Sequence, residues 1–145
     1  MNMLSKAIAI ASEVFKNTKD KGGKPYILHC LRVMNGVDQN DEEIMTIAIL
    51  HDVAEDFPDV YPISRFFLDG FSTRVTTALA LLCHNKEKVS YDDYIHAIAH
   101  NEDARKVKLV DLQDNSNITR LKGIGKKDFD RMEKYHKAYL YLSRV

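Results

Sequence analysis

The sequence has 145 residues, 45% hydrophobic and 29% charged, so it can bury a core as one domain without disulfides. Lysine plus arginine number 21, as do aspartate plus glutamate, and this neutral balance argues against a main role in binding nucleic acid polymers. The two cysteines do not form a secreted disulfide framework, and the apolar run 7–11 is too short for a signal peptide or membrane span. We therefore expect a cytoplasmic protein with one domain over residues 1–145, no membrane association and no obligate protein partner.

Apolar residues recur at helical spacing along the whole chain, and no segment alternates with the period of a strand. Eight helical segments are predicted, separated by glycine, proline and asparagine: 4–15, 25–34, 42–56, a short one around 66–67, 75–82, 91–100, 103–121 and 129–139. Asp41 and Ser90 precede two of these segments and are residue types that cap helix N-termini. The pattern predicts an all-α fold, a single-domain helical bundle.

The segment 42–56 ends in four polar side chains within two turns: His51, Asp52, Glu55 and Asp56. Residues three or four apart share one side of a helix, so these side chains crowd one side of its last turns. Acids near a helix C-terminus oppose the helix dipole and are badly placed for stability. A bound cation is the simplest feature that would favour them.

Two other predicted helices carry polar side chains at positions of interest. Taken alone, His29 suits a core histidine bonded to a carbonyl, and Asp111 with Asn115 suits a solvated polar face. Two imidazoles and two carboxylates from three helices can instead hold one divalent ion inside a bundle; these would be His29, His51, Asp52 and Asp111. Nitrogen and oxygen donors without thiolate suit manganese, iron, nickel or zinc, and disfavour calcium. Such an ion lowers the pKa of a bound water and so provides a nucleophile near neutral pH.

Three stretches of the chain resemble the HD-domain phosphohydrolases, and within them the small stand-alone RelA/SpoT-type alarmone hydrolases. The matching stretches are Gly23-Lys24-Pro25-Tyr26-Ile27-Leu28-His29, Leu50-His51-Asp52-Val53-Ala54-Glu55-Asp56 and Lys108-Leu109-Val110-Asp111-Leu112-Gln113-Asp114-Asn115. They come in the family's order, and the similarity spans nearly the whole chain. The combination is specific, although no single stretch is.

The resemblance implies an HD-type helical domain that binds one divalent ion, expected to be manganese, and a small-molecule nucleotide. It implies roles for eight side chains: metal ligands His29, His51, Asp52 and Asp111, catalytic acids Glu55 and Asp56, and substrate contacts Lys21 and Asn115. The family's reaction removes pyrophosphate from the 3′ position of guanosine 3′,5′-bis(diphosphate), the alarmone ppGpp. Because 145 residues hold no synthetase domain, we expect degradation without synthesis.

Asp20 and Phe57 depart from the family's pattern, which has arginine and threonine at these positions. The family's arginine lies against the purine, so the first departure concerns base preference. Two other functions stay open: an HD-type nucleotidase or phosphatase acting on another nucleotide, and a nucleotide-binding sensor without turnover. The nucleotidase would release orthophosphate rather than pyrophosphate. The sensor would be marked by loss of Glu55 or Asp56, and neither is lost.

Asp92, His96 and His100 are spaced four apart on one predicted helix. They suit either a second metal site or a solvated face, and we favour the solvated face because no fourth ligand is evident. Three further residues either line a nucleotide pocket or simply pack, and the sequence does not separate these roles: Tyr91, Tyr94 and Arg105.

Overall fold

The computed structural model describes residues 1–145 and contains eight α-helices and no strand. In chain order the helices are α1 (Met3–Val14), α2 (Ile27–Asn35), α3 (Glu42–Asp56), α4 (Ile63–Leu68), α5 (Thr73–Leu82), α6 (Tyr91–Ile98), α7 (Glu102–Asn115) and α8 (Lys126–Arg144). A short 3-10 helix, η1 (Ile118–Arg120), lies between α7 and α8. The predicted all-α fold is confirmed. None of the helices has the length and apolar character needed to cross a membrane.

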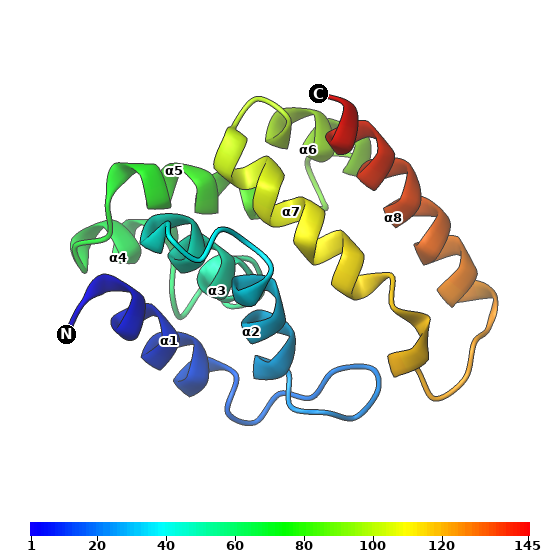
Figure 1. Ribbon diagram of the computed structural model, residues 1–145, viewed down its shortest axis with the longest axis horizontal. Coiled ribbons are helices and arrows are strands. Elements are labelled where there is room, and N and C mark those ends of the chain that lie inside the picture. Colours follow the sequence, from blue (N-terminus) through cyan, green and yellow to red (C-terminus); the bar gives the residue numbers. More distant parts are fainter.

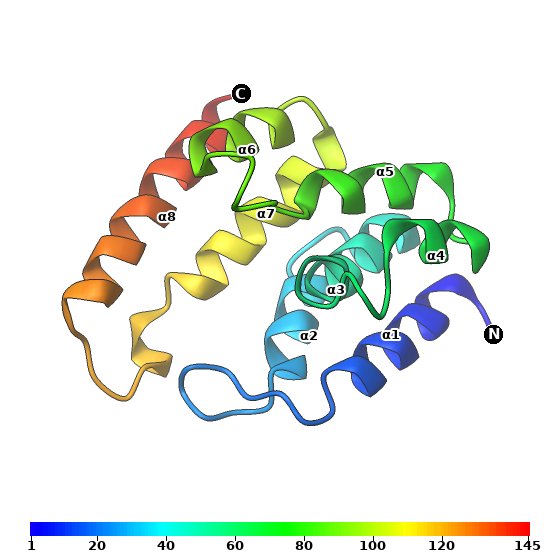
Figure 2. The ribbon, with the colours of Figure 1, turned by 180° about the vertical axis from the view of Figure 1, so that it is seen from behind.

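Helix α3 lies at the centre of the bundle and contacts α1, α2, α5 and α7 (Figure 1). Ten of its 15 residues are buried, so it is covered on nearly all sides, which explains why its sequence is apolar almost all round. Helix α7 packs on α2, α3 and α5 and lies between them and α8 in both views (Figure 2). One hydrophobic cluster takes side chains from every α-helix, so the chain folds around a single core.

Both ends of α3 follow from local sequence. The Asp41 side chain accepts a hydrogen bond from the Ile44 N–H at 3.2 Å, which confirms the predicted cap. At the other end, Phe57 has a non-helical conformation directly before Pro58, as steric crowding before a proline requires. The helix therefore stops at Asp56, with its polar last turns facing α2 and α7.

The predicted helix over 103–121 is wrong at its C-terminus, because α7 ends at Asn115. Just beyond it, the Asn117 side chain accepts a hydrogen bond from the Thr119 N–H at 3.2 Å. Local bonds of this kind compete with helical ones, and here the chain turns into η1. The turn packs closely on the loop before α2, since a Cβ on Gly22 would collide with the carbonyl oxygen of Arg120. A continuous helix would instead have carried Arg120 further along the axis of α7.

Candidate metal centre

Four buried side chains from three helices meet at the C-terminal end of α3. They are His29 from α2, His51 and Asp52 from α3, and Asp111 from α7. One donor atom from each lies within 4.8 Å of the others, and no member is more than 6% exposed. The structure therefore brings together all four residues that the sequence predicts as ligands.

The facing atoms of this cluster are spaced as the ligands of one ion would be. His29 Nε2 lies 2.9 Å from Asp111 Oδ1 and 3.2 Å from Asp52 Oδ2. His51 Nε2 lies 3.3 Å from Asp111 Oδ1 and 3.2 Å from Asp52 Oδ1. Two ligand atoms about 2.1 Å from an ion, at right angles, are about 3.0 Å apart. The donor set therefore fits a divalent ion that accepts nitrogen and oxygen ligands.

Each of the four side chains is also bonded to a further protein group. The bonds are His51 Nδ1 to the Ala48 carbonyl at 2.6 Å, Tyr26 Oη to Asp52 Oδ2 at 2.8 Å, Lys108 Nζ to Asp111 Oδ2 at 2.9 Å, and His29 Nδ1 to Asp114 Oδ2 at 2.6 Å. Such partners fix ring orientation and tautomer and so aim the remaining atom at the ion. Both histidines thereby present Nε2 to the centre.

Without an ion, the two imidazoles carry positive charge beside the carboxylates, in addition to the Lys108 ammonium that pairs with Asp111. Burial lowers the pKa of His29, but hydrogen bonds to Asp111 and other carboxylates outweigh burial and raise the pKa to about 11. Burial likewise lowers the pKa of His51, but Asp52 and Asp111 outweigh it and raise the pKa to about 9. Two imidazolium charges equal the charge of one divalent ion. Binding of such an ion would therefore displace two protons near neutral pH.

Glu55 and Asp56 lie beside this cluster without belonging to it. Together with Asp52 they form a second group, in which one oxygen from each lies within 4.8 Å of the others. Glu55 accepts a hydrogen bond from the His84 N–H at 2.9 Å, and burial raises the pKa of its carboxyl group. Burial, followed by repulsion from Asp52 and Glu55, raises the pKa of Asp56 to about 7. A carboxyl group that titrates near neutral pH can both accept and donate a proton.

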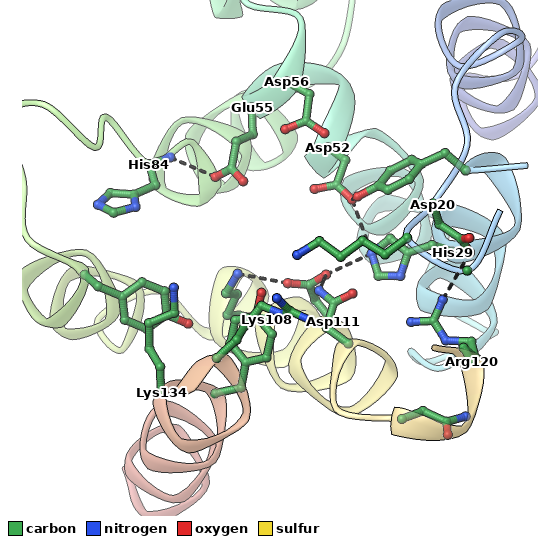
Figure 3. A pocket seen from close by; sticks show the side chains of 18 of the residues that line it. Asp20, His29, Asp52, Glu55, Asp56, His84, Lys108, Asp111, Arg120 and Lys134 are labelled. Atoms are coloured by element: carbon green, nitrogen blue, oxygen red, sulfur yellow. Dashed lines mark hydrogen bonds and ion pairs between the residues drawn. The ribbon is translucent and has the colours of Figure 1, made fainter. Parts of the chain in front are cut away.

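A cavity of about 370 Å³ is lined by every member of both groups except His51. Figure 3 shows Asp52, Glu55 and Asp56 along one side, with Lys108 and Asp111 facing them. Six lysine and arginine side chains also line it: Lys21, Lys86, Lys108, Arg120, Arg131 and Lys134. Lys108, Arg120 and Arg131 pair with carboxylates, whereas the other three form no ion pair. The cavity therefore carries three lysine charges without an ion-pair partner.

Aromatic rings cover another part of the cavity. Tyr91 and Tyr94 both line it, together with Tyr135 from α8, whereas Arg105 does not. The Lys134 ammonium lies 4.7 Å from the centre of the Tyr91 ring. Burial, followed by repulsion from Lys86, lowers the pKa of Lys134. This end of the cavity thus combines flat aromatic surface with positive charge.

The predicted substrate contacts, Lys21 and Asn115, both line the cavity. Asn115 Nδ2 donates to Asp111 Oδ1 at 3.1 Å, so this amide also holds a member of the buried cluster. Asp20 also lines the cavity, where it accepts a hydrogen bond from the Lys24 N–H at 2.9 Å and lies 3.4 Å from Arg120. Its charge is therefore compensated by the chain itself.

Several residues of the site were missed by sequence reasoning. Asp114 gave a usable signal, because it lies three residues after Asp111 and so on the same side of α7. Lys86 and Lys134 gave none, since one comes from a loop and the other from α8. The residues spaced four apart on the predicted helix 91–100 lie outside this site. One of them, His96, packs its ring against that of Tyr141, with 4.6 Å between the ring centres.

The site is thus assembled from α2, α3, α6, α7 and α8, together with η1 and the loops before α2 and α6. Three members of its donor set, its acid pair and six cationic side chains line one cavity. No family model matches the chain, and no curated protein matches it.

Proposed function

We propose that the chain is a metal-dependent phosphohydrolase, and that its substrate is guanosine 3′,5′-bis(diphosphate), from which it releases the 3′ pyrophosphate. The observation that carries the proposal is one cavity lined by members of a buried two-histidine, two-aspartate donor set, by a pair of titratable carboxylates and by unpaired lysines. The resemblance of three sequence stretches to the RelA/SpoT-type hydrolases supports the choice of substrate and of manganese.

The residues around the cavity divide the chemistry between them. When bound, a divalent ion supplies a Lewis acid for a phosphoryl oxygen and lowers the pKa of a water. Asp56, whose pKa is raised to about 7 by burial and by repulsion from Asp52 and Glu55, takes the proton of the attacking water. Glu55, held by the His84 N–H, orients that water and assists the departure of the leaving group.

A polyphosphorylated substrate is supported by the charge of the cavity. Lys21, Lys86 and Lys134 line it without a carboxylate partner, and phosphate oxygens are the acceptors that such ammonium groups bind. The rings of Tyr91 and Tyr135 offer flat surfaces for a base or ribose. A volume of about 370 Å³ also falls within the range of small-molecule sites.

The experiment that tests the proposal is a substrate panel. Protein freed of metal is reloaded with manganese, offered guanosine tetraphosphate and other nucleotides, and the products are separated by ion exchange. Guanosine diphosphate and pyrophosphate are expected from guanosine tetraphosphate, and the Glu55→Gln variant serves as the inactive control. Orthophosphate from another nucleotide would establish a nucleotidase instead. Nucleotide binding without any product would establish a sensor.

A further inference from the structure

Asp114 has an unusual number of partners for one carboxylate near the end of α7. Its Oδ2 lies 2.6 Å from His29 Nδ1. Arg32 from α2 binds both oxygens of the Asp114 carboxylate. Its Nε donates to Oδ1 at 2.7 Å, and its Nη2 donates to Oδ2 at 3.1 Å. Arg120 from η1 lies 3.3 Å from Oδ2 and donates to the Asp114 carbonyl oxygen at 2.7 Å. This carboxylate thus joins α2, α7 and η1.

We propose that Asp114 is a positioning residue, which holds His29 so that Nε2 points at the metal centre. The inference rests on the proposed metal-binding function. An imidazole has two nitrogens, and only the one without a proton can bind an ion. When the ring gives up one proton on metal binding, the Nδ1 proton donated to Asp114 is kept and the lone pair falls on Nε2, the atom that lies 2.9 Å from Asp111 Oδ1. Without that acceptor, the tautomer and the ring orientation are no longer fixed.

The two arginines make Asp114 a rigid acceptor rather than a mobile one. A bidentate arginine fixes the plane of a carboxylate as well as its position, and Arg32 supplies that fork. Arg120 adds a second restraint and also pairs with Asp20, in the loop before α2 (Figure 3). The side chain of Asp114 is only 13% exposed, so water competes little for these bonds. The orientation of His29 is therefore set from three separate segments.

Helix α7 also provides a matched control at its first turn. Arg74 from α5 binds Asp103 in the same bidentate way. Its Nε donates to Oδ2 at 2.8 Å, and its Nη2 donates to Oδ1 at 2.9 Å. The Asp103 side chain is 18% exposed, close to the value for Asp114. Unlike Asp114, however, it bonds no residue of the metal centre. Replacing either aspartate by asparagine therefore alters a bidentate arginine pair on the same helix, and only the change at Asp114 also alters the contacts to Arg120 and His29.

The test measures metal binding by titration calorimetry, with Mn²⁺ and Co²⁺ added to metal-free protein and no nucleotide present. Asp114→Asn should bind both ions about 10- to 100-fold more weakly, the usual effect of losing the partner of a ligating histidine. Asp103→Asn should match wild type within about twofold, since it alters no ligand. Saturating Mn²⁺ should restore the kcat of Asp114→Asn and leave its KM near that of wild type.

Equal metal affinity in wild type and Asp114→Asn would overturn the positioning role while leaving the metal centre intact. An equal loss in Asp103→Asn would also overturn it, because the effect would then come from general destabilisation. Failure of wild type itself to bind either ion would overturn the proposed function along with this inference. Since the readout is binding without substrate, a wrong choice of nucleotide has no effect on the outcome.

Discussion

The two ends of α3 both carry clustered acids, but the acids are satisfied in different ways. At the N-terminus, Asp41, Glu42 and Glu43 lie where the helix dipole favours negative charge. Arg74 bonds to both Asp41 and Glu43, with contacts of 2.6 and 2.9 Å, and is itself 39% exposed. These acids have partners from the protein and from solvent. They need no ligand.

At the C-terminal end of α3, the acids lie where the helix dipole disfavours negative charge. Asp52 is buried where the dipole opposes its charge, and Glu55 and Asp56 follow on the next turn. Lys108 pairs with Asp111, and the imidazoles of His29 and His51 add positive charge beside Asp52 and Asp111 only while they hold protons. Acids alone therefore do not identify a site. Acids that remain poorly compensated after folding do.

The largest effect is expected from removing a ligand at the C-terminal end. His51→Ala should lose the bound ion and all detectable turnover, because a buried donor and its charge balance disappear together. Metal loading should also stop raising the melting temperature, since an ion stabilises only the state that binds it. Metal content by mass spectrometry and thermal melts with and without Mn²⁺ check both. Equal metal content in wild type and His51→Ala would contradict the site.

The next largest effect should come from the acid pair, which we propose to act on protons rather than on the ion. Glu55→Gln and Asp56→Asn should lower kcat by about a hundred- to ten-thousand-fold, the usual contribution of one acid or base group. Full metal occupancy and little change in KM should accompany the loss. Steady-state kinetics with metal analysis measure all three quantities. If both variants lose the ion, these carboxylates are ligands.

The pH dependence should separate the metal-free and loaded proteins. The pKa of His51 is raised to about 9 from an ordinary value of 6.5. Its stabilising contribution in metal-free protein is therefore fully present below pH 6.5 and is lost as pH rises through 9. Metal affinity should instead rise over that range, by up to about 100-fold per pH unit, if two protons are displaced. Calorimetry in buffers of different ionisation enthalpy counts those protons, and a count of zero would contradict imidazole ligation.

A smaller effect is expected from an unpaired cation of the cavity. Lys21→Ala should raise KM about tenfold and change kcat less, because a charge-assisted hydrogen bond to a phosphate is lost in both the bound and transition states. Initial rates over a range of guanosine tetraphosphate concentrations measure the split. Lys16→Ala, which removes a lysine already paired with Glu13, is the control. An unchanged KM would place the phosphates elsewhere.

The smallest effect should come from the N-terminal end of α3. Arg74→Met removes three ion pairs that are partly exposed, so the expected loss is only about 1 to 2 kcal/mol of unfolding free energy. Metal affinity and kcat should stay as in wild type. Urea unfolding and metal titration measure the two outcomes. A large loss of metal affinity would show that this end also shapes the site.

The helices themselves were decided by local sequence. Helical spacing of apolar residues predicts the all-α fold, and Asp41 and Ser90 accept the capping bonds expected of them. The crowding of His51, Asp52, Glu55 and Asp56 on the last turns of one helix follows from spacing alone. These features depend on contacts between residues a few positions apart, which a sequence states directly. The end of α7 was missed because the chain turns after Asn115 into η1, whose first residues are capped by the Asn117 side chain.

What the cluster is bonded to was decided by tertiary structure. The sequence suggests His29 and Asp111 as ligands, but their approach to 2.9 Å depends on how α2 and α7 pack on α3. The bond from His29 to Asp114 spans 85 positions, and Lys134 reaches the cavity from α8. No periodicity encodes such distances. Burial in the folded protein also changes the acidity of the site. It raises the pKa of the Asp56 carboxyl group to about 7, well above the value of an aspartate in water.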